Sequence, residues 1–228
     1  MLVESLSGAG DEIALPEDES RYVARVCRAR VGERLTATDG EGTLAQLSLT
    51  VVGRVVRARI ESLERHERSS AAVVWCGTPE GERADWLIEK LAELGVARFQ
   101  PLDCEKGRWK SSGPRWDRMS RLAKAALRQS RQCRLMKIEP PLSLAALIER
   151  EEPVGSRWLA DSEGPRPDAL GARGDALGAI GPSPGFTPQE KRLLRDHGFR
   201  PISLAPGRLR TETAALAWAA WWAGSPSN

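Results

Sequence analysis

The stretch from Cys104 to Arg118, CEKGRWKSSGPRWDR, interleaves basic side chains with two tryptophans. Cations bind phosphates and tryptophan rings stack on unpaired bases, so this pattern is typical of a surface that binds RNA. Trp109 and Trp116 are the predicted stacking residues. The cations of the stretch are Lys106, Arg108, Lys110, Arg115 and Arg118.

A basic stripe continues along the next segment, which we expect to be a helix from Met119 to Arg134. Arg121, Lys124, Arg128 and Arg131 recur at spacings of three and four residues, which places them on one helix face. If the stripe stood alone, the simpler explanation would be a helix face that is only exposed to solvent. The basic loop and the stripe together favour RNA binding as the explanation.

A second polar group stands before the C-terminal apolar segment, in PGRLRTETAALAWAA. Thr211 or Thr213 could cap the helix that follows, and Glu212 suits the positive end of its dipole. One interpretation is a helix start directed at a ligand. The other is an ordinary capped helix with a surface pair between Arg210 and Glu212.

A third candidate is the stretch IGPSPGFTPQE, which begins at Ile180. Thr187 as N-cap, Pro188 at the first helical position and Glu190 three residues after the cap predict a helix with a capping box. The apolar run from Ala176 to Ile180 predicts a strand, so the glycines and prolines form a rigid turn. The turn has neither of the common phosphate-binding glycine patterns, and its prolines lack backbone donors, so it suits an apolar or purine face.

These groups need a scaffold, and the second part of the chain alternates strands with helices. Such alternation predicts a parallel α/β sheet, whose ligands bind at the carboxyl ends of strands. The predicted helices are 83–94, 119–134, a segment from 188, and 211–222. The predicted strands are AAVVWCG, VARFQPL, SRWLAD, ALGAI and RPISLA.

The first part of the chain is rich in strand-forming residues. A turn at Asp39–Gly42 predicts a hairpin, and apolar residues alternate with basic ones from Val51 to Ile60. Ser20–Gly32, with Arg25 and Arg28, is expected to be a short helix or loop. Short strands of this kind predict a small barrel. The run Glu64–Ala72 is the candidate linker, which gives domains 1–66 and 71–228.

Composition narrows the class of protein. Apolar residues make up 41% of the 228 residues, which is enough for a core, and the net charge of +3 alone does not identify a partner. The four cysteines are scattered and the two histidines stand apart, so we expect no metal site. With neither a secretory signal nor a membrane-length apolar run, we expect reduced thiols and a cytoplasmic location.

Four stretches resemble the RsmE family of ribosomal RNA uridine-N3 methyltransferases, within the SPOUT superfamily. IEKLAELGVARFQPL is similar to its K-x-x-ELGV-x-x-I-x-P segment, IGPSPGFTPQE to its IGPEGGF-x-x-E loop, and LAPGRLRTETAAL to its LG-x-x-ILR-x-ETA loop. YVARVCRARVGERL, followed by Asp39-Gly40, is similar to its H-x-x-RVLR-x-x-x-G-D…DG pattern. The stretches occur in order over almost the whole chain.

The resemblance implies an N-terminal PUA-like β-barrel that binds RNA and a C-terminal α/β SPOUT domain with a parallel sheet and a trefoil knot. It also implies S-adenosylmethionine as cofactor and a homodimer. The cofactor site would comprise Leu159, Ala160, Asp161, Ile180, Gly181, Pro182, Ser183, Gly185, Phe186, Leu204, Ala205, Leu209, Arg210, Thr211 and Thr213. RNA would contact Arg25, Arg28, Lys106, Arg108, Arg115, Arg121, Lys124 and Arg128.

The implied activity is N3-methylation of a uridine in small-subunit (16S) ribosomal RNA. Arg210 would stabilise the developing uracil anion, and Glu212 is a candidate base. This sequence departs from the family pattern at Ser183, Pro184, Arg128 and Gln132, with Met136 in place of a proline and Tyr22 in place of a histidine. Two alternatives therefore stay open: an RNA-binding or ribosome-assembly protein without methyl transfer, and methylation of a different RNA nucleotide.

Overall fold

The computed structural model describes residues 1–4, 6, 8, 10–80, 83–109, 114–150, 155–167 and 174–224. The chain forms two compact units. The first comprises Met1–Arg68 and Leu127–Leu135, and the second comprises Ser69–Ala126 and Met136–Asn228. In the described part, no helix combines the length and the apolar character needed to cross a membrane.

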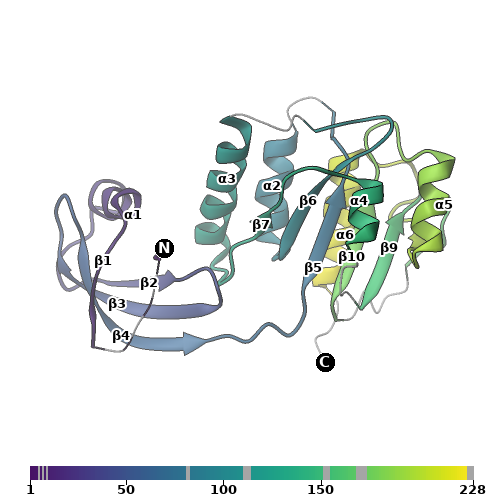
Figure 1. Ribbon diagram of the computed structural model, residues 1–228. Helices are drawn as coiled ribbons and strands as arrows, with labels where there is room; N and C mark the ends of the chain where they lie inside the picture. Colours follow the sequence, from purple (N-terminus) through teal and green to yellow (C-terminus); the bar gives the residue numbers. More distant parts are fainter. Residues whose placement is uncertain are drawn as a thin grey trace. The chain divides into compact units, whose positions relative to one another are not determined.

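The first unit contains a four-stranded antiparallel sheet in the order β1-β4-β3-β2 (Figure 1). Alternate residues of β3 are buried, including Leu47 and Leu49, so one face of the sheet carries the core. The predicted hairpin between β2 and β3 is confirmed. The strands are Glu12–Ala14, Arg34–Thr38, Thr43–Val51 and Arg57–Arg65.

The hairpin turn depends on one carboxylate and two glycines. The Asp39 side chain accepts hydrogen bonds from the amides of Glu41 at 2.7 Å and Thr43 at 3.0 Å. Gly40 and Gly42 have φ angles of 74° and 111°, a region that glycine enters without steric cost. The turn signal in the sequence therefore matches the backbone.

Three expectations for this part of the chain need adjustment. The alternating segment from Val51 to Ile60 is a strand only from Arg57 onward, because β3 ends at Val51 and a bend containing Gly53 precedes β4. The helix-or-loop segment contains helix α1, Glu17–Arg21, followed by one π-helical stretch, Tyr22–Val26. The connection between the sheets is shorter than the expected linker, since residues 66–71 separate β4 from β5.

The second unit contains a seven-stranded sheet in the order β11-β9-β10-β5-β6-β7, with β8 also paired to β6. Every pairing in it is parallel, which confirms the predicted fold class. All five residues of β5 and of β10 are buried, as expected for central strands covered on both faces. The strands are Ala72–Cys76, Arg98–Asp103, Lys137–Ile138, Leu142–Ser143, Ser156–Ala160, Ala176–Ile180 and Arg200–Ile202.

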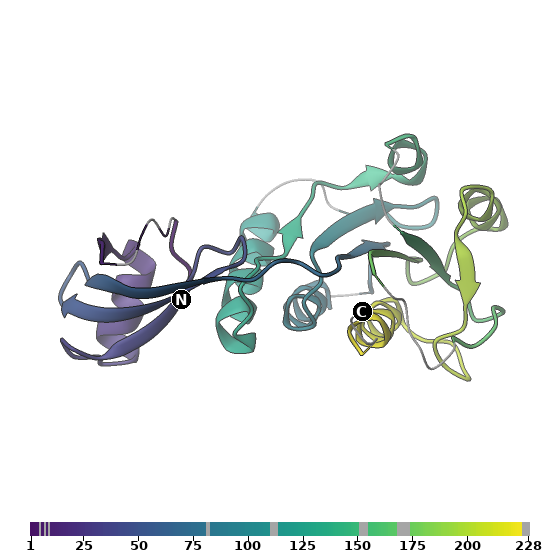
Figure 2. The same cartoon turned by 90° about the horizontal axis from the view of Figure 1, so that it is seen from below.

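Helices α2 and α6 cover one face of this sheet, and α4 and α5 cover the other (Figure 2). The bounds of α2, α5 and α6 agree closely with the sequence, whereas α3 begins and ends earlier than expected. It stops at Ser130, and Arg131 then has a φ of 55°. Strands β7 and β8 and helix α4 were not predicted. The helices are Ala84–Glu93, Pro114–Ser130, Leu144–Glu149, Pro188–Asp196 and Thr211–Ala223.

Helix α6 approaches the sheet closely because β10 has a glycine under it. Trp218 is fully buried and its ring lies over Gly178. A Cβ atom at Gly178 would lie 2.5 Å from the indole ring. The position of α6 therefore depends on the absence of a side chain at this residue.

We expect Gly178→Ala to lower the free energy of unfolding of the second unit by about 1–3 kcal/mol, because overpacking forces the helix or the ring to move. The matched control is Gly207→Ala in the same unit, where an added Cβ atom meets nothing within 4 Å. Thermal and urea unfolding of both variants measures the difference. Equal stability of the two variants would contradict this account of the contact.

Candidate active-site cavity

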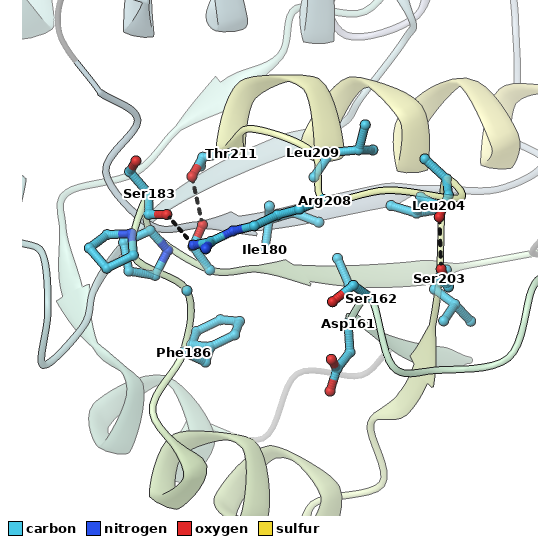
Figure 3. A pocket seen from close by; sticks show the side chains of 18 of the residues that line it. Asp161, Ser162, Ile180, Ser183, Phe186, Ser203, Leu204, Arg208, Leu209 and Thr211 are labelled. Carbon is cyan, nitrogen blue, oxygen red and sulfur yellow. Dashed lines mark hydrogen bonds between the residues drawn. The ribbon is translucent and has the colours of Figure 1, made fainter.

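A cavity of about 260 Å³ lies at the carboxyl ends of β9, β10 and β11, beside the start of α6 (Figure 3). Loops after neighbouring strands of a parallel sheet meet at such an edge. Ile180, Phe186 and Leu209 give the cavity apolar surface, while Asp161, Lys191 and Arg208 give it charge. The other lining residues are Ala160, Ser162, Gly181–Gly185, Ile202–Ala205, Gly207, Thr211 and Ala214.

The loop between β10 and α5 forms one wall through its backbone. The Gly185 amide donates to the carbonyl of Pro182 at 2.7 Å and closes a tight turn. The amide of Ser183 donates to Thr78, and its carbonyl accepts from Arg208 at 2.9 Å (Figure 3). The turn therefore needs no donor from Pro184, so the prolyl residue is compatible with it.

This loop rests directly on neighbouring backbone. A Cβ atom at Gly77, just after β5, would lie 2.4 Å from the nitrogen of Pro182. A Cβ atom at Gly107 would lie 3.0 Å from the Pro182 ring. Gly77 has no room for a side chain because the Pro182 backbone occupies that space, and at Gly107 a Cβ atom would crowd the Pro182 ring.

Trp109 supports the same region from the core, so its predicted role in base stacking is wrong. Its side chain is 4% exposed, and its indole nitrogen donates to the carbonyl of Cys76 at 2.9 Å. Its ring lies 5.7 Å from Phe99 and 6.3 Å from the half-buried Trp116. The apolar rings of this stretch thus hold the loop after β6 against the end of β5.

The loop between β11 and α6 forms the opposite wall. The Thr211 hydroxyl donates to the carbonyl of Gly181 at 3.0 Å, which joins the two loops. Arg210 is the N-cap of α6 and makes no side-chain cap, so capping by Thr211 or Thr213 was a wrong expectation. Thr211 connects α6 to β10 instead.

Asp161 and Lys191 form a partly buried ion pair in the cavity wall. The Lys191 ammonium lies 2.9 Å from Oδ1 of Asp161, and Arg195 reaches Oδ2 at 3.1 Å. The Asp161 side chain is only 1% exposed. Burial alone raises the pKa of this carboxyl. The hydrogen bonds from Lys191 and from the Glu163 amide, with the charges of both cations, outweigh burial and hold the pKa below its usual value.

Comparison with known proteins places this architecture in a family. The RNA methyltransferase domain matches residues 66–223, and the RNA methyltransferase PUA domain matches residues 15–55. The ribosomal RNA small subunit methyltransferase E of Mycobacterium tuberculosis is 31% identical over 229 residues, which cover 93% of this chain and 86% of the relative. The chain belongs to the ribosomal RNA small subunit methyltransferase E (RsmE) family.

Solved structures agree with this assignment. The Neisseria gonorrhoeae ribosomal RNA small subunit methyltransferase E, bound to S-adenosylmethionine, has the same fold, with a TM-score of 0.87 and 24% identity over 96% of this chain and 94% of that one. A putative methyltransferase from Legionella pneumophila, in complex with the same cofactor, has a TM-score of 0.81 and 26% identity over 96% and 93%. The two-unit architecture is thus that of RsmE proteins.

Most of the residues predicted to bind the cofactor of this RsmE protein lie together in the cavity. The exceptions are Leu159, which is buried in β9, and Arg210 and Thr213, which are exposed. Eight lining residues were not predicted: Ser162, Pro184, Lys191, Ile202, Ser203, Gly207, Arg208 and Ala214. Their neighbours in the motifs could have indicated the loop residues, but nothing near Lys191 in the sequence indicated its role.

Glu212, the candidate base, is held away from the cavity lining. It is 2% exposed, and its Oε1 is hydrogen-bonded to the guanidinium of Arg83 at the start of α2. Its Oε2 has no hydrogen-bond partner among the described residues. Glu212 lies in the first turn of α6 and Arg83 at the start of α2, so this ion pair joins the beginnings of the two helices.

The predicted RNA-contacting residues fall into two groups. Within the first unit, Arg128 donates to Glu19, which is 1% exposed, and its guanidinium lies 5.8 Å from the centre of the Tyr22 ring. Its charge is therefore already compensated. The exposed members are Arg25 and Arg28 in the first unit, and Lys106, Arg108, Arg121 and Lys124 in the second; the side chain of Arg115 and all of Lys110 lie outside the described part.

Replacing the two partners of the Arg83–Glu212 pair should change the stability by different amounts. Arg83→Met leaves a buried carboxylate without its cation, and we expect a loss of about 3–5 kcal/mol in the free energy of unfolding. Glu212→Gln leaves an arginine whose side chain is 46% exposed and can turn into water, so we expect a loss of about 1 kcal/mol. Urea unfolding of the second unit measures both. A larger loss for Glu212→Gln would contradict this description of the pair.

Proposed function

We propose that this protein transfers a methyl group from S-adenosylmethionine to N3 of a uridine in small-subunit ribosomal RNA. The observation that carries the proposal is the cavity itself. Two loops that resemble RsmE motifs converge on it together with the end of β9, although the three segments stand apart in the sequence.

The cavity residues suit the chemical parts of the cofactor. Ile180, Phe186 and Leu209 provide apolar surface for the adenine ring. Backbone carbonyls and amides of the two loops are available for its polar edge. When bound, the cofactor supplies an electrophilic methyl group, so the protein mainly has to orient it and exclude water.

We propose that Arg210 acts on the RNA side of the reaction. It is exposed at the start of α6, next to the cavity-lining residues Leu209 and Thr211, and no ion pair of its side chain is present in the described part. A guanidinium beside the uracil oxygens would stabilise the anion that forms when N3 loses its proton to solvent water, and N3 would then take the methyl group as S-adenosylhomocysteine is released. The target base must leave its stack to reach this position. Glu212 supports the helix ends rather than proton transfer.

Methyl transfer to unmodified small-subunit ribosomal RNA, as free RNA and in reconstituted subunits, tests this function, with mass mapping of the product. We expect Arg210→Ala to lower the rate about 10²–10³-fold. Cofactor affinity should stay within about twofold, because the side chain does not line the cavity. Arg192→Ala, an exposed residue of α5, is the control and should keep the wild-type rate.

The outcome separates the proposal from its alternatives. RNA binding without methyl transfer by the wild type in either substrate would favour the assembly-protein alternative. A methyl group on another nucleotide would favour the second alternative. An Arg210→Ala variant that retains the wild-type rate would exclude the role proposed for Arg210 but would not contradict the proposed methyl transfer.

RNA binding is proposed to use the exposed cations of each unit. Replacing Arg121 and Lys124 by alanine should weaken binding to all RNAs by a similar factor and should reduce the salt slope by about 1 for each lost phosphate contact. Arg128→Ala should instead destabilise the first unit, because Glu19 would lose its cation. Filter binding over a range of salt concentrations, with unfolding curves, measures both. An unchanged salt slope for the double variant would mean that the stripe is only solvated.

We further propose that the protein forms a homodimer through its second unit, which corresponds to the domain predicted at 71–228. We also propose that this domain contains a trefoil knot. The family resemblance supports both, and Trp86 on α2, which contacts α6, leaves 48% of its surface exposed. Light scattering at micromolar concentration should give twice the monomer mass, and Trp86→Lys should shift it toward the monomer. A monomer mass for the wild type would contradict the dimer.

We also propose a cytoplasmic location, because the proposed substrate is ribosomal RNA.

A further inference from the structure

The charged part of the cavity is a small cluster between β9 and α5. Lys191 lines the cavity and its side chain is 27% exposed, while Asp161 is almost completely buried beside it. Arg195 binds the second oxygen of Asp161, and the amide of Glu163 donates to the first oxygen at 3.3 Å. In Figure 3 the Asp161 carboxylate points toward α5, from which both cations come.

Hydrogen-bond capacity in this cluster is unevenly used. Asp161 already accepts from Lys191, Arg195 and the Glu163 amide, so little of its capacity is left. A lysine ammonium has three donors, and Asp161 takes one of those of Lys191. The Glu163 carboxylate lies 4.0 Å from the ammonium, beyond hydrogen-bond distance. Of the two charged groups of this cluster that line the cavity, Asp161 and Lys191, the one with unused hydrogen-bond capacity is therefore the Lys191 ammonium.

The local charge also favours an anion. Asp161 carries one negative charge against the two positive charges of Lys191 and Arg195, and the side chain of Glu163 is 83% exposed, so water screens it. Lys191 lies in the first turns of α5, where the helix dipole adds positive potential. A lysine is unfavourable at this end of a helix, and the pairing with Asp161 offsets that cost.

We propose that Lys191, positioned by Asp161, binds the carboxylate at the amino-acid end of S-adenosylmethionine. The inference rests on the proposed function and deepens it. The carboxylate is the only anionic group of the cofactor; its adenine and ribose are neutral, and its sulfonium and ammonium are repelled by a cluster with excess positive charge. Arg208 is the other cation of the lining, but its side chain is exposed, so water screens its charge more than that of Lys191.

Two ligands separate this contact from the rest of the site. S-adenosylhomocysteine contains the amino-acid end, whereas methylthioadenosine shares its adenosine and thioether but lacks that end. Removing one charge-assisted hydrogen bond should reduce affinity about 10–100-fold. We therefore expect Lys191→Met to lose this factor for S-adenosylhomocysteine and to bind methylthioadenosine within about twofold of the wild type.

Isothermal titration calorimetry of the full chain measures these affinities, with circular dichroism to confirm folding. Lys191→Arg should recover part of the lost affinity, and Arg192→Met, the next residue of α5, should bind both ligands like the wild type. An equal loss for both ligands, or no loss for S-adenosylhomocysteine, would overturn the inference while leaving the proposed function intact. A wild-type protein that binds neither of them nor S-adenosylmethionine would overturn both.

Discussion

The cavity depends on a contact between two backbones, where Pro182 lies against Gly77. Because Gly77 has no side chain, the loop after β10 can rest on the end of β5, and the Gly77 amide donates to Ile180 at 2.8 Å. The hydrogen bond from Thr211 then fixes the start of α6 to the same loop. The rim of the cavity is therefore backbone that three neighbouring segments hold in place, and side chains of the loop can vary without moving it.

Buried acids connect this rim to the helices around it. Glu190 completes the capping box of α5 by accepting from the amide of Thr187 at 2.8 Å, and its other oxygen accepts from the amide of Glu105 at 2.8 Å. It thereby joins the loop after β6 to the start of α5, one residue before Lys191. Asp161 holds the same helix through Lys191 and Arg195. A buried carboxylate needs such donors, so each acid determines where a neighbouring element must lie.

Local signals in the sequence were sufficient for some of these features and insufficient for others. The strand, turn and capping box around Thr187 were predicted because a cap and a turn depend on residues a few positions apart. The burial of Trp109 was missed because its contacts with Cys76 and Phe99 come from distant strands, and charged neighbours made it look exposed. Lys191 was missed for the same reason, since its partner Asp161 is 30 residues away and a helix lysine is ordinarily solvated.

The departures from the family pattern have different physical meanings once each is placed. At Ser183 and Pro184 the turn is closed by Gly185, and Ser183 contributes its amide and carbonyl, so these changes leave the wall of the cavity intact. Arg128 belongs to the first unit, where Glu19 and the Tyr22 ring surround its guanidinium. A cation at this position is matched by a buried carboxylate, and the tyrosine in place of the family's histidine offers it a ring face. Two of the departures, Arg128 and Tyr22, thus contact each other in the first unit, and the two in the loop after β10 keep its turn closed.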